Sequence, residues 1–174
     1  MTGKILAGLI VVTALIAGVA LYYLQVYAYY DDVEVTENPV QLTSLVTGSP
    51  ESIVANDFQG IDADSSPLRY RACFTTIHSH AMLSETYVPY DDAVPLTAPN
   101  WFDCYDAIEI GEALEAGSAL AYMGKADIIY GFDRVVAIME DGRGFVWHQL
   151  NECGAKLFDG QPLPEGCPPP PERN

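Results

Sequence analysis

Residues 5–24 read ILAGLIVVTALIAGVALYYL and contain no charged side chain. At about 1.5 Å per residue, a helix of this length crosses a hydrocarbon core of roughly 30 Å. The run therefore predicts one transmembrane helix, which decides how the rest of the chain is organised. The remainder of the 174 residues is long enough for one domain with a core, placed on one side of the membrane.

A cleavable signal peptide is the alternative interpretation, because Lys4 precedes the apolar run and residues 18–20 (GVA) offer small side chains for cleavage. The run, however, is longer than the apolar core of most signal peptides. It also leads into tyrosines of the kind that settle at headgroup level, namely Tyr22, Tyr23, Tyr27, Tyr29 and Tyr30. We therefore expect a retained anchor in residues 1–30 that contacts the bilayer through residues 5–24.

Charge predicts the orientation of this anchor. Lys4 lies before the span, whereas four carboxylates follow it within residues 31–37 and the next basic residue is Arg69. Positive residues stay on the cytoplasmic side, so the N-terminus is expected inside and the following domain outside.

The cysteines agree with an outer, oxidising compartment. All of them follow the span, and their spacing contains neither a CxxC pair for zinc nor a CxxCH haem motif. An even number in a small domain predicts two disulfides, for which three pairings are possible. We favour Cys73–Cys104 and Cys153–Cys167, the second of which closes a short loop rich in glycine and proline.

Composition divides the rest of the chain into an acidic linker (31–39), a folded domain (40–167) and a proline-rich tail (168–174). Strands are expected at 41–46, 52–58 and 68–77, where β-branched and aromatic residues gather or alternate with polar ones. Prolines interrupt residues 87–101 and exclude a long regular element there.

One main helix is expected after Asp106, which is placed to cap it with Glu109 three residues later. Its apolar face contains Ile110, Ala113, Leu114, Gly117 and Ala121, and Gly124 is the expected residue just past its end. Residues 128–139 and 144–150 then predict a hairpin, because Asp141-Gly142 lies between two apolar runs. Strands, one helix and a hairpin indicate an α+β domain.

Sequence motifs give no support for an enzyme. GxSxG, HExxH, Walker A and GxGxxG are all absent from the chain. His148 follows Trp147 in the expected hairpin, and we interpret it as a packed aromatic residue rather than a catalytic base. We predict no catalytic residue.

Residues 78–82 (HSHAM) suggest a metal site. On a strand, His78, His80 and Met82 would point to the same side, and imidazole with thioether suits copper. We keep a copper-handling assembly factor as the alternative function, and surface residues without a ligand as the simpler interpretation. The leading expectation includes no cofactor.

The strongest functional signal is charge. All 24 acidic residues but only seven of the eight basic residues follow the span, so that part of the chain carries a formal charge of −17. This charge excludes nucleic acid as a partner and favours a basic protein such as a soluble cytochrome c. Solubility alone is the simpler explanation. The exposed helix residues Glu109, Glu112 and Glu115 are the expected contact residues.

The span also offers a contact surface. Ala14 and Gly18 form a pair of small residues one helical turn apart, which allows another membrane helix to approach closely. Small residues are frequent in membrane helices in any case. We nevertheless expect the helix to pack against a membrane-embedded protein complex.

Four stretches carry a resemblance to a known family: residues 1–6 (MTGKIL), 22–30 (YYLQVYAYY), 60–67 (GIDADSSP) and 69–74 (RYRACF). They resemble a family of uncharacterised, single-span alphaproteobacterial proteins. The resemblance implies a bacterial origin and adds no catalytic residues. With the predicted span, orientation and disulfides, it leads us to expect an inner-membrane protein with a periplasmic domain. Together with the charge, it leads us to expect a non-catalytic accessory or assembly subunit of a respiratory or photosynthetic complex.

Overall fold

The computed structural model describes residues 2–35 and 39–171. Residues 36–38 of the expected linker and 172–174 of the expected tail lie outside the described residues, as does Met1. The chain divides into two compact units, Met1–Asp31 and Asp32–Asn174, and each is described by itself.

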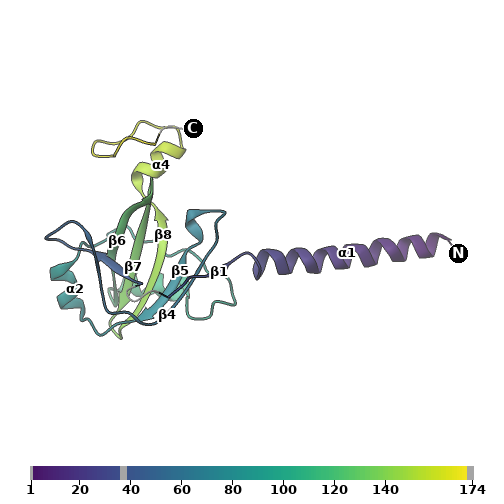
Figure 1. Cartoon of the computed structure of the whole chain (residues 1–174), viewed down its shortest axis with the longest axis horizontal. Coiled ribbons are helices and arrows are strands. Elements are labelled where there is room, and N and C mark those ends of the chain that lie inside the picture. The colour runs from purple at the N-terminus through teal and green to yellow at the C-terminus, as the bar shows by residue number, and fades with distance from the viewer. Residues whose placement is uncertain (1, 36–38, 172–174) are drawn as a thin grey trace. The chain divides into compact units, whose positions relative to one another are not determined.

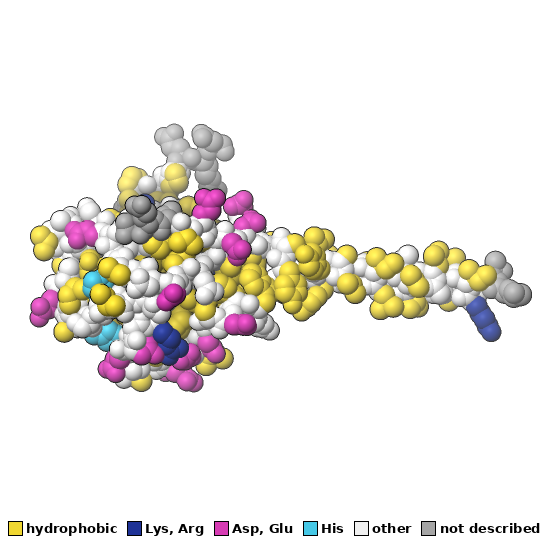
Figure 2. Space-filling view, turned by 60° about the horizontal axis from the view of Figure 1, so that its bottom comes forward, with side chains coloured by type: hydrophobic (Ala, Val, Ile, Leu, Met, Phe, Trp, Pro, Cys, Tyr) yellow, Lys and Arg dark blue, Asp and Glu magenta, His cyan; other side chains and the backbone are white. Residues whose placement is uncertain are grey.

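The first unit is dominated by the helix α1 (Thr2–Val26). Its segment Gly3–Val26 is long and apolar enough to cross a membrane, with a mean hydropathy of 2.5. None of that segment is buried against protein, and its apolar side chains cover the rod drawn in Figure 2. Helix α1 is therefore a candidate membrane span, as the charge-free run predicted.

The second unit is built on a six-stranded sheet with the order β1-β4-β5-β8-β7-β6 (Figure 1). The pairs from β4 to β6 are all antiparallel. The strands are β1 (Asp31–Asp32), β4 (Asn56–Asp62), β5 (Arg71–Thr75), β8 (Arg143–Leu150), β7 (Phe132–Met139) and β6 (Ala119–Ile129). A separate antiparallel pair joins β2 (Gln41–Thr43) to β3 (Pro50–Ser52).

Short helices complete the domain: η1 (Pro67–Arg69, a 3-10 turn), α2 (His80–Thr86), α3 (Ala107–Ala116) and α4 (Glu152–Phe158). The main helix expected from the sequence is α3, whereas α2 and α4 were not predicted. Both favoured disulfides, Cys73–Cys104 and Cys153–Cys167, are present. The prediction of an α+β domain with two disulfides and an apolar N-terminal helix is confirmed.

The sheet is buried on both faces because side chains alternate along each strand. Val136 and Val146 belong to a core cluster that also contains Leu42 and Leu83, from β2 and α2. Their strand neighbours Val135 and Trp147 point the other way and are fully buried as well. This double burial explains why β7 and β8 read as nearly continuous apolar runs.

Helix α3 ends earlier than expected. Asp106 caps its start by accepting hydrogen bonds from the amides of Ile108 and Glu109. Gly117 then turns the chain with a φ of 73°, and the Ser118 amide bonds to the Ala113 carbonyl. The prediction that Gly124 follows the helix was therefore wrong, because Gly117 already adopts the left-handed conformation that terminates helices. Residues 119–129 form β6 instead.

Other strand boundaries also shift. The expected hairpin is present, but residues 128 and 129 belong to β6, because Gly131 turns the chain with a φ of +84°. The strand expected at 52–58 begins at Asn56 and continues to Asp62. The strand expected at 68–77 is confined to Arg71–Thr75, because residues 67–69 form a 3-10 turn.

The proline-interrupted segment between α2 and α3 lies against the sheet and is held there by a buried arginine and a disulfide. Arg71 on β5 is 4% exposed. Its guanidinium donates hydrogen bonds to the carbonyls of Leu96, Thr97, Leu68 and Tyr70 over 2.6–3.1 Å. The disulfide from Cys73 to Cys104 fastens the same segment two residues further along β5. A loop without regular structure is thus fixed at two points.

The same segment covers part of the sheet edge formed by β6. The Tyr90 amide bonds to the carbonyl of Ala121, and the Met123 amide bonds to that of Val88. Further along, the pairing of β6 with β7 shifts register on either side of Lys125. The outer edge of β6 is therefore covered in its first half and irregular in its second.

Candidate functional site

The acidic residues favoured by the sequence lie where α3 meets the turn between β7 and β8. The Glu140 amide at the end of β7 bonds to the carbonyl of Ser118, which directly follows α3. The turn itself needs Gly142, whose φ is +88° and whose Cβ, if present, would lie 2.6 Å from the Thr76 carbonyl oxygen. This packing brings the start of β8 beside the first turn of α3.

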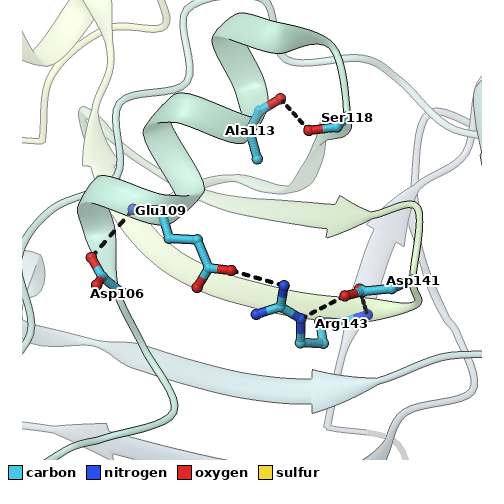
Figure 3. Close-up of polar contacts among 6 residues, drawn as sticks. All are labelled: Asp106, Glu109, Ala113, Ser118, Asp141 and Arg143. Carbon is cyan, nitrogen blue, oxygen red and sulfur yellow. Dashed lines mark hydrogen bonds and ion pairs between the residues drawn. The ribbon is translucent and has the colours of Figure 1, made fainter.

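Arg143, the first residue of β8, joins these two elements (Figure 3). Its Nη2 lies 2.9 Å from Glu109 Oε1, and its Nε lies 2.8 Å from Asp141 Oδ2. The backbone amide of Arg143 also donates to Asp141. These amide and guanidinium hydrogen bonds lower the pKa of the Asp141 carboxyl, and the two carboxylates raise the pKa of Arg143. Asp141 and Arg143 are therefore both charged at neutral pH.

A groove of about 410 Å³ lies at this junction. Its walls carry the carboxylates of Glu109, Glu112, Glu140 and Asp141 and the guanidinium of Arg143, above the smaller or apolar side chains Ala113, Ser118 and Met139. Four carboxylates and one guanidinium give it a formal charge of −3. We call this the acidic groove. Chemically it suits a cationic group, because exposed carboxylates accept hydrogen bonds and attract positive charge.

The structure brings only part of the predicted contact set together. Glu109 and Glu112 line the acidic groove, whereas Glu115 is exposed on the same helix but does not line it. Glu140 and Asp141 were missed, because the sequence marked their segment only as a hairpin turn. Glu109 does not complete a capping box with its side chain, which turns to Arg143 instead.

The small residues of the span lie on α1. Gly18 has open space around the position of a Cβ, with no atom within 4 Å, and Ala14 lies one helical turn before it. Both are exposed within this chain.

The proposed copper ligands do not lie on a strand. Ser79 caps α2, so His80 and Met82 are in its first turn and His78 precedes it. On a helix, alternate residues are about 200° apart, so a shared direction is lost. His80 Nε2 lies 2.9 Å from the Ile138 carbonyl oxygen, and Met82 packs against the core cluster. Among the described residues, no group of three His, Cys, Asp or Glu residues is placed to hold a metal ion. Copper binding stays a prediction.

His148 is a packed aromatic residue, as expected. Its ring stacks on that of Tyr70 with 4.5 Å between the ring centroids. The Arg134 guanidinium carbon in turn lies 4.5 Å from the centroid of the Tyr70 ring. Nδ1 donates to the Pro67 carbonyl, and Nε2 accepts from Arg134 Nε. Burial and the nearby Arg134 charge lower the pKa of His148 to about 3. The imidazole is therefore neutral and fully hydrogen-bonded.

Comparison with known proteins gives one match. Curated proteins and solved structures give none. A family model described as a family of unknown function matches residues 40–168, which include β2 to β8, α2 to α4, the acidic groove and both disulfides. Since the match covers well over half of the chain, the protein belongs to this family of unknown function, DUF6446.

Proposed function

We propose that this chain is a non-catalytic accessory subunit of a respiratory or photosynthetic complex in a bacterial inner membrane. Its periplasmic domain recruits a basic partner, such as a soluble cytochrome c, through the acidic groove. The span and the two disulfides support this location, because disulfides persist in oxidising compartments.

The observation that carries the proposal is that three arginine side chains of the domain are engaged within it, whereas most carboxylates are exposed. Arg71 is buried among carbonyl groups, Arg134 is bound to His148 and Tyr70, and Arg143 is paired with two carboxylates. The carboxylates, by contrast, are mostly exposed, and on the face drawn in Figure 2 they far outnumber the basic side chains. The surface of the domain therefore presents many more carboxylates than guanidinium groups, which favours encounter with a basic protein.

Salt dependence of association tests the proposal. The full chain is reconstituted in nanodiscs, and its association with a basic cytochrome c is followed by stopped-flow fluorescence. Between 0.01 M and 0.15 M ionic strength the Debye length falls from about 30 Å to about 8 Å. We expect the on-rate to fall by about tenfold or more over this range, with a smaller change in the off-rate. Absence of association at low salt would refute the recruitment.

A pair of triple variants separates the groove from the overall charge. Glu109→Gln, Glu112→Gln and Glu140→Gln remove three carboxylates that line the groove. Asp64→Asn, Glu85→Gln and Glu165→Gln remove the same charge from exposed positions outside the groove. A binding groove predicts a larger loss of affinity for the first variant. Equal losses would mean that the whole domain attracts the partner and that the groove has no special role.

A further inference from the structure

A second cleft, of about 450 Å³, lies at the start of the domain. One wall is the segment 32–35 with Val33 and Val35, and the opposite wall is the loop that carries Trp101 and Phe102. Gly60 of β4 forms part of its floor, and the Val33 amide bonds to the Gly60 carbonyl at 2.8 Å. The disulfide from Cys104, which also lines the cleft, to Cys73 holds the loop, and the hydrogen bond from Val33 to Gly60 holds the segment 32–35.

The cleft differs in character from the acidic groove. Val35 is 68% exposed, and the partly exposed ring of Trp101 meets Phe102 edge to face at 6.3 Å between centroids. Asp32 and Asp103 are the charged residues of its lining. A tryptophan among apolar side chains with a polar rim is the composition that settles at the boundary between water and hydrocarbon.

Chain connectivity points to what covers this cleft. Asp32 follows Val26, the last residue of α1, by only six positions. Six residues extend to at most about 20 Å. Between them lie Tyr27, Tyr29 and Tyr30, which continue the aromatic character of the end of the span. One wall of the cleft is thus tethered close to the end of the candidate membrane span.

We propose that this cleft docks onto the lipid bilayer, with Trp101 and Val35 in the headgroup region. The tether keeps the bilayer at a high effective concentration, so a modest apolar surface suffices for docking. Asp32 and Asp103 repel anionic headgroups, so the surface fits zwitterionic lipid. The inference rests on retention of the anchor and is independent of the recruitment of a basic partner.

Tryptophan fluorescence tests this docking directly, because Trp101 and Trp147 are the two tryptophans and Trp147 is fully buried. The full chain is reconstituted in phosphatidylcholine vesicles, and the spectrum of Trp101→Phe is subtracted from that of the unmodified chain. Lipid brominated near the headgroup should cause about a twofold loss of the Trp101 emission, since a ring at that depth meets bromine atoms. Aqueous iodide should quench it weakly. Strong iodide quenching without an effect of brominated lipid would overturn the proposal.

Two further measurements keep the test sharp. Val35→Ser should reduce the quenching by brominated lipid, whereas Phe158→Ser, at an equally exposed apolar position on α4, should not. Replacing part of the phosphatidylcholine by phosphatidylglycerol should also reduce it. Equal quenching in Val35→Ser and Phe158→Ser would refute a role for the cleft. The retained emission of Trp147 reports whether the Trp101→Phe chain has folded.

Discussion

Arg71 and Arg143 lie at opposite ends of the same strand pair, β5 and β8, on the same face of the sheet. Thr75, four residues after Arg71, is the register partner of Arg143. Arg71 is buried and bound to backbone carbonyls, whereas the Arg143 side chain is 44% exposed and bound to carboxylates. In a strongly acidic chain, one guanidinium thus organises the interior and the other adjusts the charge of a surface groove. The comparison teaches that burial, rather than charge alone, decides how much an arginine contributes to stability.

The largest effect is expected at Arg71. Arg71→Met leaves the carbonyls of Leu96 and Thr97 without their donor and releases the loop that covers one face of the sheet. We expect a loss of about 3–5 kcal/mol in the free energy of unfolding. Urea unfolding of the full chain in detergent micelles measures it, with Arg69→Met as the exposed neighbouring control. A loss below about 1 kcal/mol would mean that water replaces the guanidinium at these carbonyls.

The disulfides sharpen the comparison, because Cys73–Cys104 fastens the loop that Arg71 holds. Replacing both of its cysteines by serine should cost about 3–4 kcal/mol, and slightly less is expected for Cys153–Cys167, whose sequence separation is 14 rather than 31. Combined with Arg71→Met, loss of the first bridge should be non-additive and loss of the second additive. Additivity in both combinations would show that Arg71 and Cys73–Cys104 stabilise the domain independently.

Arg134 is partly buried, between the extremes of Arg71 and Arg143, and its contact with His148 predicts that the free energy of unfolding depends on pH. The pKa of His148 is about 3 in the folded chain, against 6.5 for an exposed histidine. The unfolded chain therefore binds more protons as pH falls below 6.5, and the free energy of unfolding decreases. Between pH 6.5 and about pH 5 this amounts to about 2 kcal/mol. Unfolding curves over this range measure it, and His148→Gln should flatten the dependence. An unchanged slope in His148→Gln would assign the effect to other groups.

The smallest effect on stability is expected at Arg143. Arg143→Gln should cost less than about 1 kcal/mol, because exposed ion pairs contribute little. It removes the positive charge from the acidic groove, however, so the on-rate of a basic partner should rise at low salt. Thermal unfolding and stopped-flow binding of the same preparation measure both quantities. A stability loss comparable to that of Arg71→Met would erase the distinction between the two arginines.

The features predicted from sequence are those with strong local signals. A charge-free run identified α1, and an Asp-Gly turn identified the hairpin of β7 and β8. The pairing of Cys153 with Cys167 was favoured from a short loop between them. Each of these depends on residues that are close together in the chain, and each agrees with the structure.

The error in the length of α3 arose because the apolar helical pattern continues past the glycine that ends the helix. Apolar residues up to Ala121 suggested a longer helix, although Gly117 ends it and β6 begins at Ala119. The sequence predicted only some of the residues that line the acidic groove, for a different reason. Glu109 and Asp141 are far apart in the chain and meet only because α3 packs beside the β7–β8 turn. Arg71 was not singled out either, since nothing in the sequence marks an arginine as buried.

The covered and irregular edge of β6 has a consequence for self-association of the domain. An unpaired strand at the edge of a sheet can pair with the edge strand of a second copy of the same chain. A regular open strand would then invite copies to join their sheets and aggregate. The segment around Val88 and Tyr90 occupies the first half of β6, and the register shifts at Lys125 disrupt the second half. This edge therefore offers no continuous ladder of hydrogen bonds to a second copy, which disfavours aggregation through β6.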